Sequence, residues 1–251
     1  MLVNEMKNRL IHAVVARHDT NQGCTKQARK IFAVLALGLL CAARVAAEPL
    51  PAAKDILSTV RLQQSRQQID LQGQLRQDAA VVPFRLTQNG PLIKYSFANP
   101  PGALQLRLGD NDSRLEELSQ SGVEKITPAQ FDHKVRGTAI SYEDLALKFL
   151  YWPNAKVIGD EPVRSRRCWK VELHPASRDS QYSTVLLWID RNTGALMEME
   201  GYDWNGRLAK RFEVISVQKI EDRWFLKQMR IDQIDPATQK VQSRTYLEIK
   251  K

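Results

Sequence analysis

The chain has 251 residues, a formal net charge of +9 and three cysteines. Residues 1–47 hold seven basic and two acidic residues, so the remaining chain carries a net charge of only +4. Such a mild surplus, without a dense basic stripe, argues against a dedicated nucleic-acid binder. Two of the cysteines also lie in residues 1–47. Cys168 therefore has no disulfide partner in the remainder, which at about 200 residues is long enough to rely on its core.

Residues 1–47 have the order of a leader that ends in a signal peptide. An uncharged apolar run, residues 31–43, follows basic residues, and small residues precede the expected cleavage after Ala47. The run is too short to span a bilayer core of ~30 Å comfortably as a helix. The alternative interpretation of these residues is a buried core helix. The long stretch before it predicts a translation start downstream of the first methionine. Cys41 follows a leucine too large for the usual lipidation pattern, so we expect a soluble periplasmic protein.

The first half of residues 48–251 predicts one helix and then strands. Residues 52–66 form the helix, because Ile56, Leu57 and Val60 share one face. The hydrophobic period then changes to two. Asn89-Gly90 lies between two alternating runs, which is a strong hairpin signal. The expected strands cover residues 69–75, 82–87, 92–97, 104–108 and 113–119.

Residues 127–152 form the only substantial helical interruption that the sequence predicts. Thr127 and Pro128 are typical of a helix start. Ser141 and Asp144 have the spacing of a capping box, which predicts a second helix that runs to Pro153.

The rest of the chain predicts a meander of strands separated by Asn-, Asp- and Gly-rich turns. These strands cover about residues 155–161, 166–174, 181–190, 195–203, 207–219, 223–234 and 240–249. Eleven or twelve sequential antiparallel strands predict a mainly β (α+β) domain, residues 48–251. We expect an incomplete antiparallel β-barrel or a strongly curved sheet. The helix at residues 52–66 and the insertion at residues 127–152 should cover its concave side as a helical lid.

The sequence offers no signature of catalysis. The two histidines beyond the leader, His133 and His174, have no Cys or His partner at metal-binding spacing. No Gly-rich phosphate loop and no nucleophile elbow occurs, and the acidic pairs lie at turns or strand ends. We therefore predict no catalytic residues, no metal site, no cofactor and no enzyme, although a pocket with converging polar groups would revive an enzymatic interpretation.

Apolar side chains on the alternating strands are the candidate ligand-binding residues. The strand with Val185 and Leu187 is apolar on both faces, which predicts a cover on each side. Methionine adapts to irregular apolar surfaces. The residues expected to line an apolar cavity are Phe84, Leu86, Tyr95, Phe97, Leu104, Leu106, Val185, Leu187, Met197, Met199, Met229 and Ile231. Ordinary core packing is the alternative role for each.

The second half of the chain resembles the outer-membrane lipoprotein-sorting family, the LolA-like proteins. The resemblance covers about residues 50–250 and rests on hairpin turns and strand patterns. The matching runs are Tyr182–Gly194, Glu200–Lys210, Lys219–Trp224, Thr245–Ile249 and Ser141–Leu145.

This resemblance implies an incomplete antiparallel barrel, lidded by helices, that binds the acyl chains of lipoproteins in the periplasm. It implies a monomeric carrier that serves outer-membrane sorting, with lipoprotein acyl chains or lipid as cargo. An inner-membrane release complex and an outer-membrane acceptor would be its partners, and nucleic acid would not. The alternative is an interaction module on the same fold that senses envelope lipids or lipoproteins without transporting them.

Overall fold

The structure is a computed structural model that describes residues 50–220 and 222–250. The leader predicted at residues 1–47 lies outside the described residues. The helix predicted at residues 52–66 is α1, Ala53–Gln64. Its face with Ala53, Leu57 and Val60 is buried, whereas Leu62 lies off that face and is exposed. α1 is therefore an amphipathic helix that covers apolar surface with one side.

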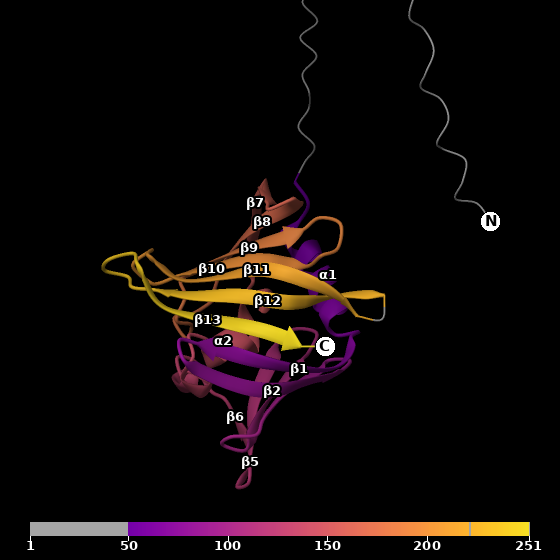
Figure 1. The fold of residues 1–251 in the computed structure, drawn as a ribbon. Coiled ribbons are helices and arrows are strands. Elements are labelled where there is room, and N and C mark those ends of the chain that lie inside the picture. Colours follow the sequence, from indigo (N-terminus) through magenta and orange to yellow (C-terminus); the bar gives the residue numbers. More distant parts are fainter. Residues whose placement is uncertain (1–49, 221, 251) are drawn as a thin grey trace, which may run out of the picture. The chain divides into compact units, whose positions relative to one another are not determined.

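All described strands belong to one antiparallel sheet (Figure 1). The first meander contains β1 (Gln68–Gln77), β2 (Ala80–Asn89), β3 (Leu92–Phe97), β4 (Gly102–Leu108), β5 (Ser113–Ser119) and β6 (Gly122–Lys125). The second contains β7 (Asn154–Val163), β8 (Arg166–His174), β9 (Thr184–Asp190), β10 (Leu196–Tyr202), β11 (Leu208–Ile220), β12 (Arg223–Ile234) and β13 (Val241–Lys250). The predicted strands are thus confirmed, and β6 is an additional short one.

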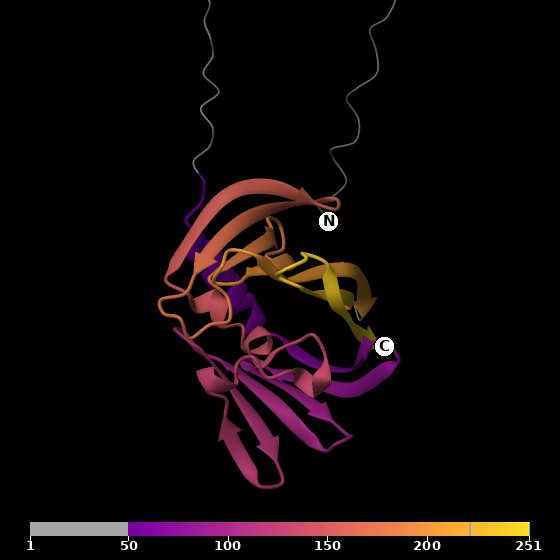
Figure 2. The ribbon, with the colours of Figure 1, turned by 90° about the vertical axis from the view of Figure 1, so that its left-hand side faces the viewer.

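The order of the strands explains how the lid arises. The sheet runs β6-β5-β4-β3-β2-β1-β13-β12-β11-β10-β9-β8-β7, so β6 and β7 are its two opposite edges. Residues 126–153 connect these edges, and we call them the crossing segment. Because strands far apart in the sheet must be joined, this segment has to travel across a face of the sheet. Figure 2 shows it, in pink, inside the fold of the curved sheet.

The crossing segment is less helical than the sequence predicts. It contains α2 (Tyr142–Ala146) and three 3₁₀ turns, η1 (Pro128–Gln130), η2 (Val135–Gly137) and η3 (Lys148–Tyr151). The predicted second helix is interrupted because Leu147 adopts a left-handed conformation, with φ of 52°. The capping box of Ser141 and Asp144 is confirmed.

This break in the helix has a packing reason. Leu145, before the break, packs against the core that contains Phe84, whereas Phe149 and Leu150, after it, pack beneath α1. A straight helix could not turn its apolar residues toward two separate cores. The turn at Leu147 therefore lets one short segment close both.

Candidate functional site

The largest apolar core lies between the crossing segment and β1–β5, β12 and β13. We call it the inner cluster. Its buried members are Leu75, Phe84, Ile93, Phe97, Leu104, Leu106, Leu108, Leu115, Ile126, Phe131, Val135, Ala139, Ile140, Ala146, Ile231 and Ile249. Because strands and crossing segment both contribute, this cluster is the interface between sheet and lid.

Eight of the twelve predicted lining residues meet at the inner cluster. Phe84, Phe97, Leu104, Leu106 and Ile231 are buried members, and Leu86, Tyr95 and Met229 pack against it. The ring of Phe84 contacts those of Tyr95 and Phe97 edge to face. Burial raises the pKa of the Tyr95 phenol to about 12, so the hydroxyl stays neutral at physiological pH.

The other four predicted residues lie elsewhere. Val185, Leu187 and Met199 belong to a second core, the helix cluster, in which β7–β10 pack against α1 and η3. Met197 lies in a small third cluster with Val163, Cys168 and Trp188. Strand β9 is therefore covered on both faces, as predicted, but α1 and neighbouring side chains provide the cover.

The space inside the inner cluster is almost closed. The cavity there has a volume of about 10 Å³, which corresponds to a single water molecule. Its lining residues are Leu75, Phe84, Tyr95, Phe97, Val135, Ile140, Leu145 and Leu247. Three of them, Val135, Ile140 and Leu145, come from the crossing segment. An acyl chain therefore fits only if this segment moves away from the sheet.

A glycine lets one aromatic ring lie flat against the sheet at this cavity. Gly73 on β1 pairs with Phe84 on β2. A β-carbon at Gly73 would lie 2.5 Å from Cζ of Phe84, far inside van der Waals contact. The missing side chain thus creates the space for the ring that forms one wall of the cavity.

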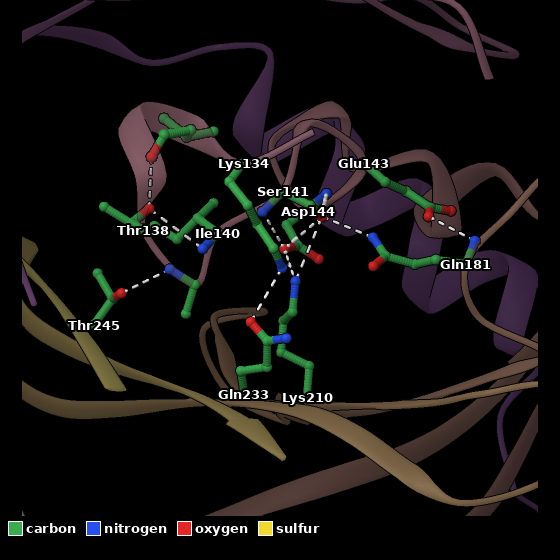
Figure 3. A network of polar contacts seen from close by, with 12 residues as sticks. Lys134, Thr138, Ile140, Ser141, Glu143, Asp144, Gln181, Lys210, Gln233 and Thr245 are labelled. Carbon is green, nitrogen blue, oxygen red and sulfur yellow. Dashed lines mark hydrogen bonds and ion pairs between the residues drawn. The ribbon is translucent and has the colours of Figure 1, made fainter. Parts of the chain in front are cut away.

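A buried polar network ties the crossing segment to the sheet (Figure 3). Nζ of Lys210, on β11, lies 2.6 Å from Oδ2 of Asp144, and the two side chains are 3% and 1% exposed. Asp144 Oδ2 also accepts hydrogen bonds from the backbone N–H and the hydroxyl of Ser141. Tyr182 donates its hydroxyl to Asp144 Oδ1 at 2.6 Å. We call Ser141, Asp144, Tyr182 and Lys210 the polar tether.

The tether satisfies a charge that burial alone would make very costly. Both carboxylate oxygens of Asp144 have partners, which is the condition under which a buried ion pair is tolerated. Burial, together with the adjacent Asp144, raises the pKa of Tyr182 well above its ordinary value and keeps this hydroxyl a donor. The tether therefore fixes the position of α2 over β11.

Two further contacts join the crossing segment to β12 and β13. The backbone N–H of Ala139 donates to Oγ1 of Thr245 on β13 at 2.9 Å. Lys134 Nζ donates to Oε1 of Gln233 on β12 at 3.1 Å (Figure 3). Burial, and next the charge of Lys210, lower the pKa of Lys134. Together with the tether, these contacts attach the segment to the second meander. The inner cluster and a hydrogen bond from the Ser113 hydroxyl to the carbonyl of Ala146 attach it to the first.

The sequence carries a signal for the tether in the register of β11, beyond the apolar alternation that predicts the strand. Lys210, Phe212 and Val214 alternate along β11, and the last two face the core. A lysine in that register has to be buried, and a buried lysine requires a carboxylate partner. Asp144 was identified only as a capping residue, since its distance from Lys210 along the chain hides the contact.

An open cleft of about 370 Å³ lies beside the inner cluster. Leu115, Ile126 and Phe131 belong to both the cluster and the cleft wall. The wall also contains polar and aromatic side chains, among them Asp112, Arg114, Lys125, Glu143, Lys148, Tyr151 and Trp152. The cleft is thus an amphipathic opening directly outside the closed apolar core.

The described residues contain no cluster of three or more His, Cys, Asp or Glu side chains arranged to hold a metal ion. Over the same ranges, 50–220 and 222–250, no helix has the length and apolar character needed to cross a bilayer. The polar tether is internally paired and lies under the lid, so its geometry suits attachment of the lid.

Comparison with known proteins assigns the fold. A family model described as "Uncharacterized protein" matches residues 119–251, and no curated protein matches the chain. The fold is similar to a DUF1329 family protein from Desulfovibrio piger, with 19% identity and a TM-score of 0.59 over 79% of this chain and 90% of that one.

Two other similar structures have names that refer to lipoprotein sorting. A putative outer membrane lipoprotein-sorting protein domain from Vibrio parahaemolyticus has 16% identity and a TM-score of 0.62, over 79% of this chain and 90% of that one. A LolA superfamily protein from Nitrosomonas europaea has 15% identity and a TM-score of 0.56, over 80% and 93%. The expected LolA-like curved sheet is confirmed at the level of the fold. Since the family model matches more than half of the residues, the chain belongs to that family of uncharacterized proteins, and its fold is LolA-like.

Proposed function

We propose that the chain is a periplasmic carrier that binds the acyl chains of lipoproteins, or of other lipids, between its curved sheet and the crossing segment. The observation that carries this proposal is the inner cluster. It is a broad apolar interface in which one whole side is a segment attached by a few polar contacts rather than by strand pairing. Such an interface can open without disrupting the sheet.

The energetics suit a carrier. Each CH₂ group that leaves water contributes ~0.8 kcal/mol, so one or two acyl chains supply ample affinity. A carrier must also release its cargo. Closure of the crossing segment onto the sheet, which leaves a cavity of only about 10 Å³ in this structure, competes with the acyl chain for the same apolar surface. The closed state therefore offsets part of the binding energy.

The open cleft is the proposed route for loading. Its wall shares Leu115, Ile126 and Phe131 with the inner cluster, so a chain that entered the cleft would reach the core by displacing the crossing segment. The polar side chains at the cleft would stay near the head group of the cargo. An inner-membrane complex would load this carrier and an outer-membrane acceptor would unload it, with the carrier itself monomeric.

Photo-crosslinking tests the proposal and locates the site. Purified chain is incubated with a fatty acid that carries a diazirine near its methyl end, irradiated and digested for mass spectrometry. We expect crosslinks to Phe84–Leu106, Met229 and the crossing segment. Val185, Leu187 and Met199, which are equally apolar but lie under α1, serve as the matched internal control. Absence of crosslinks, or crosslinks only to exposed residues, would contradict the proposal.

The second candidate is an envelope sensor on the same fold. The observation that favours it is the fully paired polar tether, which holds the lid closed over the inner cluster and suits a switch as well as a carrier. Transfer assays separate the two functions. A carrier moves a labelled acyl chain from donor to acceptor vesicles, whereas a sensor binds the chain and transfers none.

A further inference from the structure

The hairpin between β11 and β12 extends beyond the neighbouring strands β10 and β13. β11 pairs with β10 only as far as Glu213, and β12 pairs with β13 only as far as Gln228. In the described part of the chain, residues 217–220 and 223–226 pair with each other alone. We call residues 217–220 and 222–227 the distal hairpin, which is visible beside the C-terminus in Figure 1.

One face of the distal hairpin is apolar and exposed. The register places Val217 opposite Leu226 and Lys219 opposite Trp224, so these four side chains share a face. Trp224 is 69% exposed, the largest value among the large apolar residues that the structure describes, and Val217 is 45% exposed. The indole ring of a tryptophan so exposed contributes little burial energy to folding, which indicates a surface for interaction.

Basic side chains lie on both faces of the distal hairpin. Lys219 lies across from Trp224 on the same face, whereas Arg223 and Lys227 alternate to the opposite face. Asp222 is paired with Lys219 at 2.7 Å. Arg223 is held in place, because its guanidinium lies over the ring of Phe225 and donates to the carbonyl of Gln68. The hairpin thus presents an indole ring on one face and cations on both.

This combination fits a lipid surface better than a protein. Tryptophan settles at the level of the lipid head groups because its ring is apolar and its N–H is polar. Basic side chains near an anionic membrane surface contribute further attraction. A stable protein interface needs about 800 Å² on each partner, whereas a two-stranded tip with one tryptophan, which buries about 150–250 Å², offers much less.

We propose that the distal hairpin docks the protein on anionic bilayers tip first, with Trp224 inserted among the head groups and the basic side chains of both faces, Lys219, Arg223 and Lys227, within reach of the lipid phosphates. This goes beyond the binding of acyl chains and holds whether or not a chain is carried. It would bring a carrier to the surface from which its cargo comes or to which it goes.

Vesicle binding tests the proposal. The protein, purified from cells that express the full chain, is mixed with vesicles of phosphatidylethanolamine and phosphatidylglycerol and sedimented. We expect Trp224→Ser to weaken binding about tenfold, the factor that corresponds to the burial of about 60 Å² of apolar surface. Replacement of Lys219 and Lys227 by serine should weaken binding about fivefold for each charge, and neutral phosphatidylcholine vesicles should abolish that difference.

Trp204 provides a matched control. It is 40% exposed on a different turn, where its Nε1 donates to the carbonyl of Ser180 and Arg178 lies over its ring. Trp204→Ser should bind vesicles like the wild type. Brominated lipids should quench a fluorescence component that Trp224→Phe removes and Trp204→Phe retains.

Two outcomes would overturn the proposal. One is equal vesicle binding by the wild type and Trp224→Ser, with no quenching of Trp224. The other is capture of the hairpin by a protein while protein-free vesicles fail to bind it. Uptake of a fluorescent fatty acid from solution should be unchanged in Trp224→Ser, so failure of docking is distinguishable from failure of acyl binding.

Discussion

At the scale of single residues, two glycines shape the functional face by leaving space for aromatic rings. Gly73 accommodates Phe84 at the inner cluster. Gly201 on β10 accommodates Tyr182, since a β-carbon there would lie 2.5 Å from Cε1 of the tyrosine ring. Tyr182 is a member of the polar tether. The absence of a side chain at Gly201 therefore determines the position from which the Tyr182 hydroxyl donates to Asp144.

Gly201→Ala should therefore loosen the tether. The added methyl group forces the Tyr182 ring away from β10 and weakens its hydrogen bond to Asp144. We expect a loss of about 1–3 kcal/mol in the free energy of unfolding, measured by urea denaturation. Gly159→Ala on β7 is the control, because a β-carbon there would meet no atom within 4 Å and its φ is not left-handed. Equal stability of both variants would contradict this account.

Glu143, which follows Tyr142 in α2, should make stability depend on pH. Burial raises the pKa of its carboxyl above the ordinary 4.5, with a further contribution from Asp144, although the backbone N–H of Gln181 opposes the shift. The folded state therefore holds a proton that the unfolded state releases. The stabilisation is complete below about pH 4.5 and is lost as pH rises through the folded-state pKa.

Thermal unfolding across this pH range provides the measurement. Between pH 4.5 and 7, the wild type should lose stability relative to Glu143→Gln, whose side chain cannot ionise but still accepts the hydrogen bond from Gln181. Parallel pH profiles for the two proteins would show that Glu143 ionises as easily in the folded state as in the unfolded state.

At the scale of elements, the crossing segment is held by one buried ion pair and a few hydrogen bonds. Lys210→Met removes the cation and leaves Asp144 buried without its charge partner. We expect a loss of about 3–5 kcal/mol in the free energy of unfolding. Hydrogen exchange should accelerate in residues 131–146 more than in β1–β4. Lys227→Met, which removes an exposed lysine from the next strand, should leave both measurements unchanged.

A double substitution isolates the electrostatic part of this effect. Lys210→Met combined with Asp144→Asn removes both charges. The amide oxygen can still accept from the backbone N–H of Ser141, while the amide nitrogen can donate to the hydroxyl oxygen of Tyr182. The double variant should regain part of the stability lost by Lys210→Met alone, because no uncompensated charge remains buried. If the stability lost by the double variant equals the sum of the losses of Lys210→Met and Asp144→Asn alone, the interaction between Lys210 and Asp144 contributes nothing to stability.

Local patterns in the sequence predicted the elements well and the lid less well. Strands such as β2 and β12 follow from alternation, and the hairpin at Asn89-Gly90 follows from turn chemistry, with Gly90 at φ of 58°. These signals extend over a few neighbouring residues. The left-handed conformation of Leu147, which ends α2, has no such local signal. It is required because the residues before and after Leu147 pack into two different cores.

The candidate site was only partly predictable for the same reason. Alternation identified Phe84, Tyr95 and Met229 as inward-facing, and they do meet at the inner cluster. It could not tell which part of the concave face each residue would join, so Met199 was grouped with them although it lies under α1. The contact between Lys210 and Asp144 depends on the crossing of the sheet by residues 126–153, which no short window of sequence contains.

At the scale of the whole molecule, ligand binding should stabilise the protein and loosen its lid at once. An acyl ligand at 100 times its dissociation constant should add about 2.7 kcal/mol to the free energy of unfolding. Because the acyl chain fits only if the crossing segment moves, amide hydrogen exchange in that segment should increase, while exchange in the sheet should slow. Calorimetry with palmitate, followed by exchange mass spectrometry, measures both. Uniform protection of lid and sheet would contradict a displaced lid.

The pairing of β1 with β13 joins the two meanders at the middle of the sheet, between Gln72–Gln77 and Thr245–Lys250. The central seam between β1 and β13 therefore cannot form before β13 has been synthesised. Contacts this far apart in sequence close slowly. A nascent chain with this topology stays incompletely folded until β13 is available, which is the condition in which a polypeptide can still be threaded through a narrow translocation channel.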